Sequence, residues 1–179
     1  MTVSDENLAE AAAGGDPEAF SVLILRHYDR LFGLAFRLTG ARAEAEDLTQ
    51  DICAALPAKL GSYRGQARFT TWLYRVTVNA AHDRRRRRAT HVKAAEGWGD
   101  WEQNRRAANA ETEAAVDWLT EAMRALPADL RDTVALILGE ELTQKDAAEV
   151  LGVSEGTVAW RMSEVKKHLR AIHEKEAEV

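Results

Sequence analysis

The side chains best suited to chemistry lie near the C-terminus, in the segment TQKDAAEVLGVSEGTVAWRMSEVKKHLR at positions 143–170. Thr157 and Arg161 are four residues apart, so on a helix they share one face. From that face, arginine can donate two parallel hydrogen bonds to a guanine, or it can hold a phosphate. The chemistry that this pair favours is hydrogen bonding to a nucleic acid.

The residues around this pair predict that it lies on the second helix of a helix-turn-helix. That motif needs a small packing residue, a turn residue able to take positive φ and a buried apolar residue. These positions are Ala148, Gly152 and Val158. Thr143 with Asp146 resembles a capping box that begins the first helix, and Ser154 can cap the second. Residues 155–161 would then lie nearest the base edges of a major groove. A plain helical hairpin with a glycine corner remains the alternative.

Trp160 and Glu164 are also four residues apart and share a neighbouring face of the same helix. A tryptophan beside a glutamate suits an interface anchor with a polar rim better than it suits a polyanion. We therefore expect this face to contact a protein in part. Packing of Trp160 into the domain core is the alternative, since tryptophan is buried on average.

Charge is distributed unevenly along the chain, whose net charge is −5. Residues 58–93 hold ten basic residues and one acidic residue, and they include five consecutive arginines, Arg84–Arg88. Such a stretch predicts a local phosphate-binding surface on a protein that is otherwise acidic. A solvated basic helix end is the alternative for a run of this kind.

Apolar residues at helical spacing predict three helices in the first half of the chain. They cover residues 20–38, ending before Gly40; residues 45–56, where Pro57 breaks or ends the helix; and residues 69–87. The loop GSYRGQAR separates the second and third helices at positions 61–68. It could present Tyr63 to an unpaired base while its arginines hold phosphate.

The pattern fails from about residue 90 to residue 113, which is the best linker candidate. Trp98 and Trp101 within it either pack on a neighbouring domain or dock on a partner. Helical spacing returns over residues 116–126 and 130–138, and these helices would support the helix-turn-helix. The sequence thus predicts an all-α protein of two small helical domains, residues 1–89 and 114–179, joined by a flexible linker at residues 90–113.

Several functional classes find no support in the sequence. The histidines at positions 27, 82, 91, 168 and 173 show no metal-type spacing with Cys53 or with carboxylates, so we expect no metal site and no cofactor. His27 falls on an apolar stripe and is expected to be packed. No nucleophile motif or phosphate-cradling loop occurs. No signal peptide or membrane-length apolar stretch is present, and a single cysteine fits a reducing compartment, which together predict a cytoplasmic protein.

Five segments, in order along nearly the whole chain, resemble the signatures of extracytoplasmic-function (ECF) sigma factors. They are AEAEDLTQDI (43–52), SYRGQARFTTWLYRVTVNAAHD (62–83), the arginine run, LPADLRDTV (126–134) and EGTVAWRM (155–162). The resemblance implies a promoter-specificity subunit of bacterial RNA polymerase that has no catalytic activity of its own. Its implied partners are core RNA polymerase, promoter DNA and, commonly, an anti-sigma factor. Its domains would be a sigma2-like bundle and a sigma4-like helix-turn-helix.

The resemblance also implies roles for particular residues. The N-terminal domain would open and read the minus-10 element through Tyr63, Arg64, Gly65, Gln66, Arg68, Trp72, Arg75, Asn79, Arg84, Arg85, Arg87 and Arg88. The C-terminal domain would read the minus-35 element through Ser154, Glu155, Thr157, Trp160, Arg161, Glu164 and Lys167. Core polymerase would be gripped by Glu44, Glu46, Asp47, Gln50 and Asp51, which could otherwise form an exposed acidic helix face without a partner.

Three departures separate this chain from the family pattern. Pro57 stands where the helix usually continues with an aromatic residue. Ala159 with Trp160 replaces the usual basic and small polar pair, and Glu164 stands where an arginine is common. Glutamate can accept a hydrogen bond from cytosine N4 but repels phosphate, so minus-35 specificity is not transferable from relatives.

Two other functions fit the sequence less well than that of a sigma factor. A stand-alone helix-turn-helix regulator would need a ligand pocket in the N-terminal half, where the sequence instead has an acidic helix and a base-capture loop. A nucleic-acid-modifying enzyme would need a metal or nucleophile constellation, which the sequence lacks.

Overall fold

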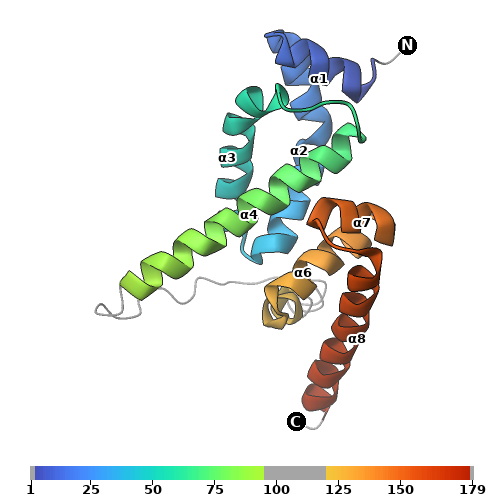
Figure 1. The fold of residues 1–179 in the computed structure, drawn as a ribbon. Helices are drawn as coiled ribbons and strands as arrows, with labels where there is room; N and C mark the ends of the chain where they lie inside the picture. The colour runs from blue at the N-terminus through green and yellow to red at the C-terminus, as the bar shows by residue number, and fades with distance from the viewer. Residues whose placement is uncertain (1–2, 95–119, 178–179) are drawn as a thin grey trace.

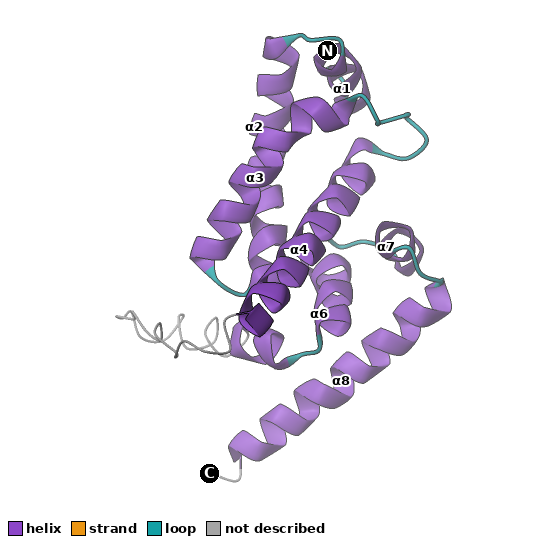
Figure 2. Ribbon diagram, turned by 60° about the vertical axis from the view of Figure 1, so that its left-hand side comes forward, coloured by secondary structure: helices purple, strands orange, loops and turns teal. Residues whose placement is uncertain are grey.

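The computed structural model describes residues 3–94 and 120–177. Within these ranges the chain folds into helices that are joined by short loops (Figures 1 and 2). The elements are α1 (Asp5–Ala13), α2 (Pro17–Thr39), α3 (Arg42–Leu60), α4 (Phe69–Ala94), α6 (Ala128–Val134), the π-helix η1 (Ala135–Gly139), α7 (Gln144–Leu151) and α8 (Glu155–Ala177). Residues 120–125 are also helical. Within these ranges there is no strand, which confirms the all-α prediction. No helix in the same ranges is long and apolar enough to cross a membrane.

Helix α2 begins and ends at strong local signals. The Asp16 carboxylate accepts hydrogen bonds from the backbone N–H groups of Glu18 and Ala19, at 2.9 and 3.1 Å, and Pro17 occupies the first turn. At the other end Gly40 has a φ of 71°, a left-handed conformation that glycine adopts without steric cost. The predicted end before Gly40 is confirmed.

Helix α3 corrects the expectation that Pro57 breaks or ends the second helix at Leu56. The helix continues through Pro57 to Leu60. Leu56 and Leu60 are both almost fully buried. Burying the Leu60 side chain stabilises the last turn by about 1.5–3 kcal/mol, which offsets much of the cost of a proline inside a helix.

Helix α4 is longer than its apolar pattern predicts. It continues to Ala94, so the first residues of the expected linker, 90–94, are helical. The rest of that linker, residues 95–113 with Trp98 and Trp101, lies outside the described residues, as do residues 116–119 of the helix expected next.

Helices α1 to α4 enclose the larger core, which consists mainly of leucines such as Leu23, Leu34 and Leu48. Helix α1 is held on this bundle by Asp5, whose carboxylate lies 2.9 Å from Arg26 and 2.8 Å from His27. His27 is 7% exposed, so its expected packing is confirmed.

The C-terminal half has a small core of its own between α6 and α8, formed by Leu126, Leu130, Val134 and Val165. The chain then passes through η1 into a turn where Glu141 takes a φ of 54°. Non-glycine residues rarely adopt this conformation, and π-helical turns are frequently found at functional sites.

The two halves of the chain pack against each other. Side chains of η1, α7 and α8, including Leu136, Ala148 and Val158, belong to the same buried cluster as the leucines of α2 and α3. In Figures 1 and 2, α6 and α7 lie beside α4. The helix-turn-helix is therefore fixed relative to the N-terminal bundle by continuous apolar contact.

Candidate nucleic-acid interface

The helix-turn-helix has the local geometry that its sequence predicts. Thr143 Oγ1 accepts a hydrogen bond from the Asp146 N–H at 3.1 Å and donates one to the Asp146 carboxylate at 2.7 Å. Gly152 ends α7 with a φ of 66°. Ser154 Oγ accepts from the Thr157 N–H at 3.1 Å and so caps α8. Val158 is fully buried against α7. The capped motif, rather than an unspecialised hairpin, is confirmed.

Helix α8 presents Trp160 outward and turns Arg161 inward. Trp160 is 59% exposed, so the alternative that it packs into the core is wrong. Arg161 has a side chain that is 17% exposed and lies 3.5 Å from the Asp129 carboxylate of α6. Glu164 pairs with Lys167 one turn further along, at 2.5 Å. The outward face therefore centres on Trp160, with Glu155 and Ser163 also exposed.

The loop between α3 and α4 holds an aromatic cluster. The Tyr63 ring centroid lies 5.7 Å from that of Phe69 and 5.5 Å from that of Trp72. The Tyr63 hydroxyl donates to the Ala67 carbonyl at 2.8 Å, and burial with nearby Glu6 and Asp5 raises the pKa of this phenol. Arg64, Gln66 and Arg68 around it are exposed. The loop thus offers the half-buried rings of Tyr63 and Trp72 beside exposed cationic and amide groups.

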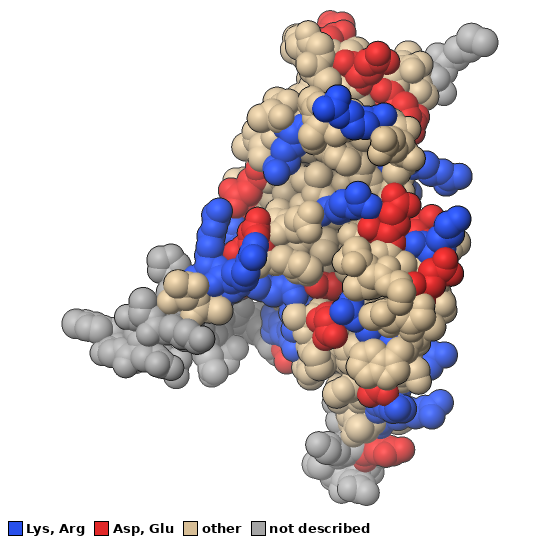
Figure 3. Space-filling view, in the orientation of Figure 1, with Lys and Arg blue, Asp and Glu red and all other residues tan. Residues whose placement is uncertain are grey.

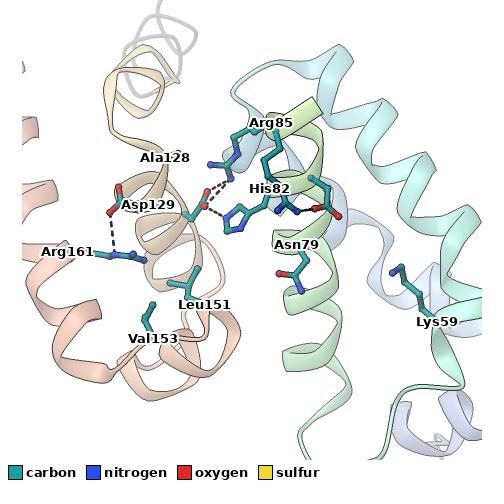
Figure 4. Close-up of a pocket in the computed structure, with 12 residues that line it drawn as sticks. Lys59, Asn79, His82, Arg85, Ala128, Asp129, Leu151, Val153 and Arg161 are labelled. Carbon is teal, nitrogen blue, oxygen red and sulfur yellow. Dashed lines mark hydrogen bonds and ion pairs between the residues drawn. The ribbon is translucent and has the colours of Figure 1, made fainter. Parts of the chain in front are cut away.

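One face of α4 is directed at the C-terminal half. Arg75 donates to the Glu149 carbonyl of α7 at 2.9 Å, and Asn79 lies one turn further along. His82 and Arg85 both bond the Asp132 carboxylate of α6, each at 2.7 Å. Between these elements lies an open cavity of about 770 Å³, lined by Asn79 from α4 and by Arg161 from α8 (Figure 4). Residues predicted to read the two promoter elements thus line the same cavity.

The arginine run is largely engaged with carboxylates. Arg84 bonds Asp47 and Asp51 of α3 at 2.9 and 3.0 Å. Arg88 bonds Glu44, and Arg86 bonds Asp83 within its own helix. Figure 3 shows basic groups (blue) and acidic groups (red) side by side on the surface. Arg87 makes no hydrogen bond or ion pair with the described part of the chain.

The acids expected to bind core polymerase share one exposed face of α3. Asp47 and Asp51 have side chains that are 65% and 72% exposed, and Glu46 and Gln50 are exposed beside them. Their spacing of one helical turn is as predicted. Arg84 lies between the two aspartates and fixes their orientation, a contact that sequence spacing did not indicate.

The two most buried acidic side chains among the described residues were not predicted from the sequence. The Asp132 side chain is 2% exposed and the Glu140 side chain 4%. Glu140 accepts a hydrogen bond from the Tyr74 hydroxyl at 2.6 Å and pairs with Arg37. Burial and this bond raise the pKa of Tyr74 far above its usual value, so the hydroxyl remains a donor. No local pattern in the sequence indicates either carboxylate, because their partners lie on helices that are distant along the chain.

Across the described residues no group of histidine, cysteine and carboxylate side chains is arranged to hold a metal ion. The arrangement can instead stack bases on aromatic rings, hold phosphates on arginines and place a capped helix in a groove. These features are typical of a DNA-binding protein.

Comparison with known proteins identifies the family. Residues 23–91 match the family model Sigma-70 region 2, and residues 117–169 match Sigma-70, region 4. The chain is 36% identical over 167 residues to the ECF RNA polymerase sigma factor SigM of Mycobacterium tuberculosis, covering 93% of this chain and 83% of that protein. It is 32% identical to the RNA polymerase sigma-H factor of Pseudomonas aeruginosa, covering 88% of each.

A solved structure agrees. The sigma factor RpoE of Bartonella quintana, crystallised with the anti-sigma factor NepR, superposes with a TM-score of 0.73 at 25% identity, over 87% of this chain and 96% of that one. CnrH in complex with the cytosolic domain of CnrY shares the fold, with a TM-score of 0.72 at 24% identity over 96% of this chain and 97% of that one. The chain belongs to the extracytoplasmic-function family of RNA polymerase sigma factors.

Proposed function

We propose that this chain binds core RNA polymerase, directs it to promoters with a particular pair of minus-10 and minus-35 elements, and helps to open the DNA there. The observation that carries the proposal is the presence, in one chain, of a capped helix-turn-helix and an aromatic loop followed by a basic helix. The likeness to SigM over 93% of this chain and 83% of that protein supports it. The polymerase supplies the catalytic chemistry, and the complex works in the cytoplasm, where that enzyme acts.

Core binding is assigned to the exposed face of α3. Asp47 and Asp51 lie one turn apart on α3, and Arg84 pairs with both of them. Exposed carboxylates in a row attract a basic partner surface and align it as it docks. Glu44, Glu46 and Gln50 extend the same surface.

Minus-10 recognition is assigned to the loop at residues 61–68 and to α4. A base taken out of the duplex loses stacking energy of a few kcal/mol, which must be recovered from rings and hydrogen bonds in its new position. Tyr63 and Trp72 supply aromatic rings, and Asn79 supplies an amide two turns along α4 from Trp72. Arg64, Arg68, Arg75 and the arginine run would hold the backbone of the strand.

Minus-35 recognition is assigned to the first turns of α8. Ser154 and Thr157 lie at the capped N-terminus of the helix, where hydroxyls and backbone N–H groups can contact phosphate. Trp160 is free to contact bases or sugars. Arg161 joins the interface when it is released from Asp129.

An anti-sigma factor is the expected regulator. The similar sigma factor of Bartonella quintana was crystallised with one. We propose that a protein of this class holds the present chain away from polymerase until a signal releases it.

The test of the proposed function is co-purification with core RNA polymerase. Purified chain and core enzyme are mixed and separated by size-exclusion chromatography, and we expect one complex with equimolar subunits. A stand-alone regulator would bind duplex DNA but elute separately from the core enzyme, and that result would reject the proposal.

A further inference from the structure

We propose that the cavity between the two halves of the chain is a binding site for a guanine nucleotide, with the base at Arg161 and the phosphates at Lys59. The cavity has a volume of about 770 Å³. Pockets that hold small ligands in proteins have volumes of about 300–1,000 Å³, so a nucleotide fits the available space. The walls come from α3 and α4 on one side and from α6, α7 and α8 on the other (Figure 4).

Arg161 has hydrogen-bond donors that the protein does not use. Its side chain is 17% exposed, and its Nε lies 3.5 Å from the Asp129 carboxylate. That Nε is nevertheless buried without a hydrogen-bond partner, and no other donor of the guanidinium makes a hydrogen bond within the described residues. Unsatisfied donors in a largely buried position cost free energy. An acceptor placed in the cavity would therefore be bound by Arg161.

The other side chains that are available in the cavity are also mainly donors. Lys59 of α3 and Asn79 of α4 are exposed, and neither side chain makes a hydrogen bond or ion pair with the described part of the chain. The carboxylates that line the cavity each contact a cation already, in the pairs Asp83 with Arg86, Asp129 with Arg161, and Asp132 with Arg85. Free donors beside neutralised carboxylates select a ligand that is rich in acceptor oxygens.

The end of the cavity beside Arg161 suits a base. Leu151 and Val153 are half-buried there, and Figure 4 shows both of them next to Arg161. Such an apolar surface can hold a flat ring while the guanidinium makes two parallel hydrogen bonds to the edge of the ring. Guanine accepts both bonds through O6 and N7, whereas adenine has an amino donor in place of O6. This end of the cavity therefore favours guanine.

The end of the cavity beside Lys59 suits phosphates. Lysine binds phosphate as a point charge, and the Asn79 amide can donate to a sugar hydroxyl or to a phosphate oxygen. In Figure 4, Asn79 stands between Arg161 and Lys59. Because the two cations stand apart, inorganic phosphate reaches only one of them. A guanosine di- or triphosphate, in which the phosphate chain extends away from the base, reaches both.

Nucleotide binding at this place would couple the chain to the supply of nucleotides. Under the proposed function, Asn79 and Arg161 contact the two promoter elements, so a bound nucleotide and promoter DNA would compete for them. This consequence rests on the proposed function, whereas nucleotide binding itself does not.

The experiment titrates GTP, ATP and inorganic triphosphate into the purified full chain in a calorimeter, at about 150 mM salt. We expect GTP to bind with a dissociation constant of about 1 mM or lower. ATP should bind about fivefold or more weakly, because it lacks one of the two acceptors for Arg161. Inorganic triphosphate should also bind more weakly than GTP, since it has no base to place on Leu151 and Val153.

A pair of variants locates the site. Lys59→Gln with Arg161→Gln should weaken GTP binding by about tenfold or more, because each change removes a charged hydrogen-bond donor. The matched control is Lys145→Gln with Arg170→Gln, which removes the same charge at exposed positions outside the cavity that have no partner among the described residues. The control should change the affinity by less than about twofold, since exposed charges are screened at this salt concentration.

Equal GTP affinities in the two variants would overturn the proposal, because the attraction would then come from net charge alone. Equal binding of GTP, ATP and triphosphate would overturn it too, because the base would then have no contact. Absence of GTP binding up to about 10 mM would reject the site outright. If circular dichroism shows lost helix in the Lys59 and Arg161 variant, Lys59→Glu is compared with Lys145→Glu by the same criteria. The assay contains neither polymerase nor promoter, so its result stands apart from the test of the proposed function.

Discussion

At the scale of single residues, Tyr63 is the side chain whose role is most open to direct test. It belongs to the cluster with Phe69 and Trp72, and its hydroxyl ties the loop to Ala67. We expect Tyr63→Ala to destabilise the promoter open complex by about 1–3 kcal/mol, the scale of base stacking on an aromatic ring. The measurement is the lifetime of open complexes after heparin challenge.

The conservative replacement Tyr63→Phe is the control, because it keeps the ring and removes the bond to Ala67. It should retain most of the lifetime. Equal losses in both variants would assign the effect to loop structure rather than to stacking. Asn79→Ala should fall in the same range as Tyr63→Ala, and duplex binding by α8 should not change in either variant.

Trp160 gives a second prediction at this scale. Because it is 59% exposed, Trp160→Ala should change the free energy of unfolding by less than about 0.5 kcal/mol. It should weaken binding to a minus-35 duplex by about 1–3 kcal/mol, since the ring is central on the outward face of α8. Calorimetry and fluorescence anisotropy measure the two quantities. Loss of anti-sigma affinity with normal DNA binding would show instead that this face is a protein contact.

The sequence predicted many of the candidate functional residues. It did not predict the residues that these side chains contact. Spacing placed Thr157 and Arg161 on one face of a helix, yet Arg161 turns toward Asp129, thirty-two positions earlier. The arginine run was visible as charge, but its pairing with α3 and α6 depends on how separate helices pack. Local patterns carry no information on such distant partners.

At the scale of secondary-structure elements, α3 provides the clearest mutation. Asp47→Arg with Asp51→Arg should reduce affinity for core polymerase by about tenfold or more, because it reverses the charge of the proposed docking face. Glu10→Arg with Glu18→Arg is the matched control, with the same charge change on exposed positions of α1 and α2. Normal core affinity in a folded Asp47 and Asp51 variant would exclude α3 as the docking surface.

The turn of the helix-turn-helix offers a prediction about stability. Gly152 has a φ of 66° and open space where a Cβ would lie, so Gly152→Ala should cost about 1–2 kcal/mol through backbone strain alone. Gly156→Ala should instead be neutral or stabilising by up to about 1 kcal/mol, because Gly156 is helical and exposed. Urea unfolding of the two variants compares them directly. Equal effects would mean that the turn carries no strain.

Caps and glycine turns were the elements best predicted from the sequence, because the interactions that define them are only three or four residues apart. Thr143 and Ser154 both accept hydrogen bonds from the nearby N–H groups of the helices that they cap, as the sequence predicts. The Pro57 prediction was wrong because burial of Leu60, a tertiary effect, outweighed a local preference. The π-helical turn at η1 was not predicted, and its buried residues pack against α2, which lies far away in sequence.

At the scale of the whole molecule, the division into two halves was visible in the sequence, whereas their association was not. Small residues on α7, such as Ala147 and Ala148, are typical of helix packing within one domain. In the structure they belong to a core that is shared with α2 and α3. Asp132 and Glu140 lie in ordinary acidic contexts of the sequence and acquire their importance from the arginines opposite. Long-range packing, rather than composition, sets the state of the free chain.

The measurement that tests the account most directly is transcription in vitro from the fragmented genome of the source organism. Core polymerase is supplied with or without this chain, and the 5′ ends of the transcripts are sequenced. The account predicts new start sites that depend on the chain and share a common pair of upstream elements, and that are lost with the Asp47 and Asp51 reversal. If the chain binds DNA but creates no new start sites, the result would contradict the claim that it directs core polymerase to promoters.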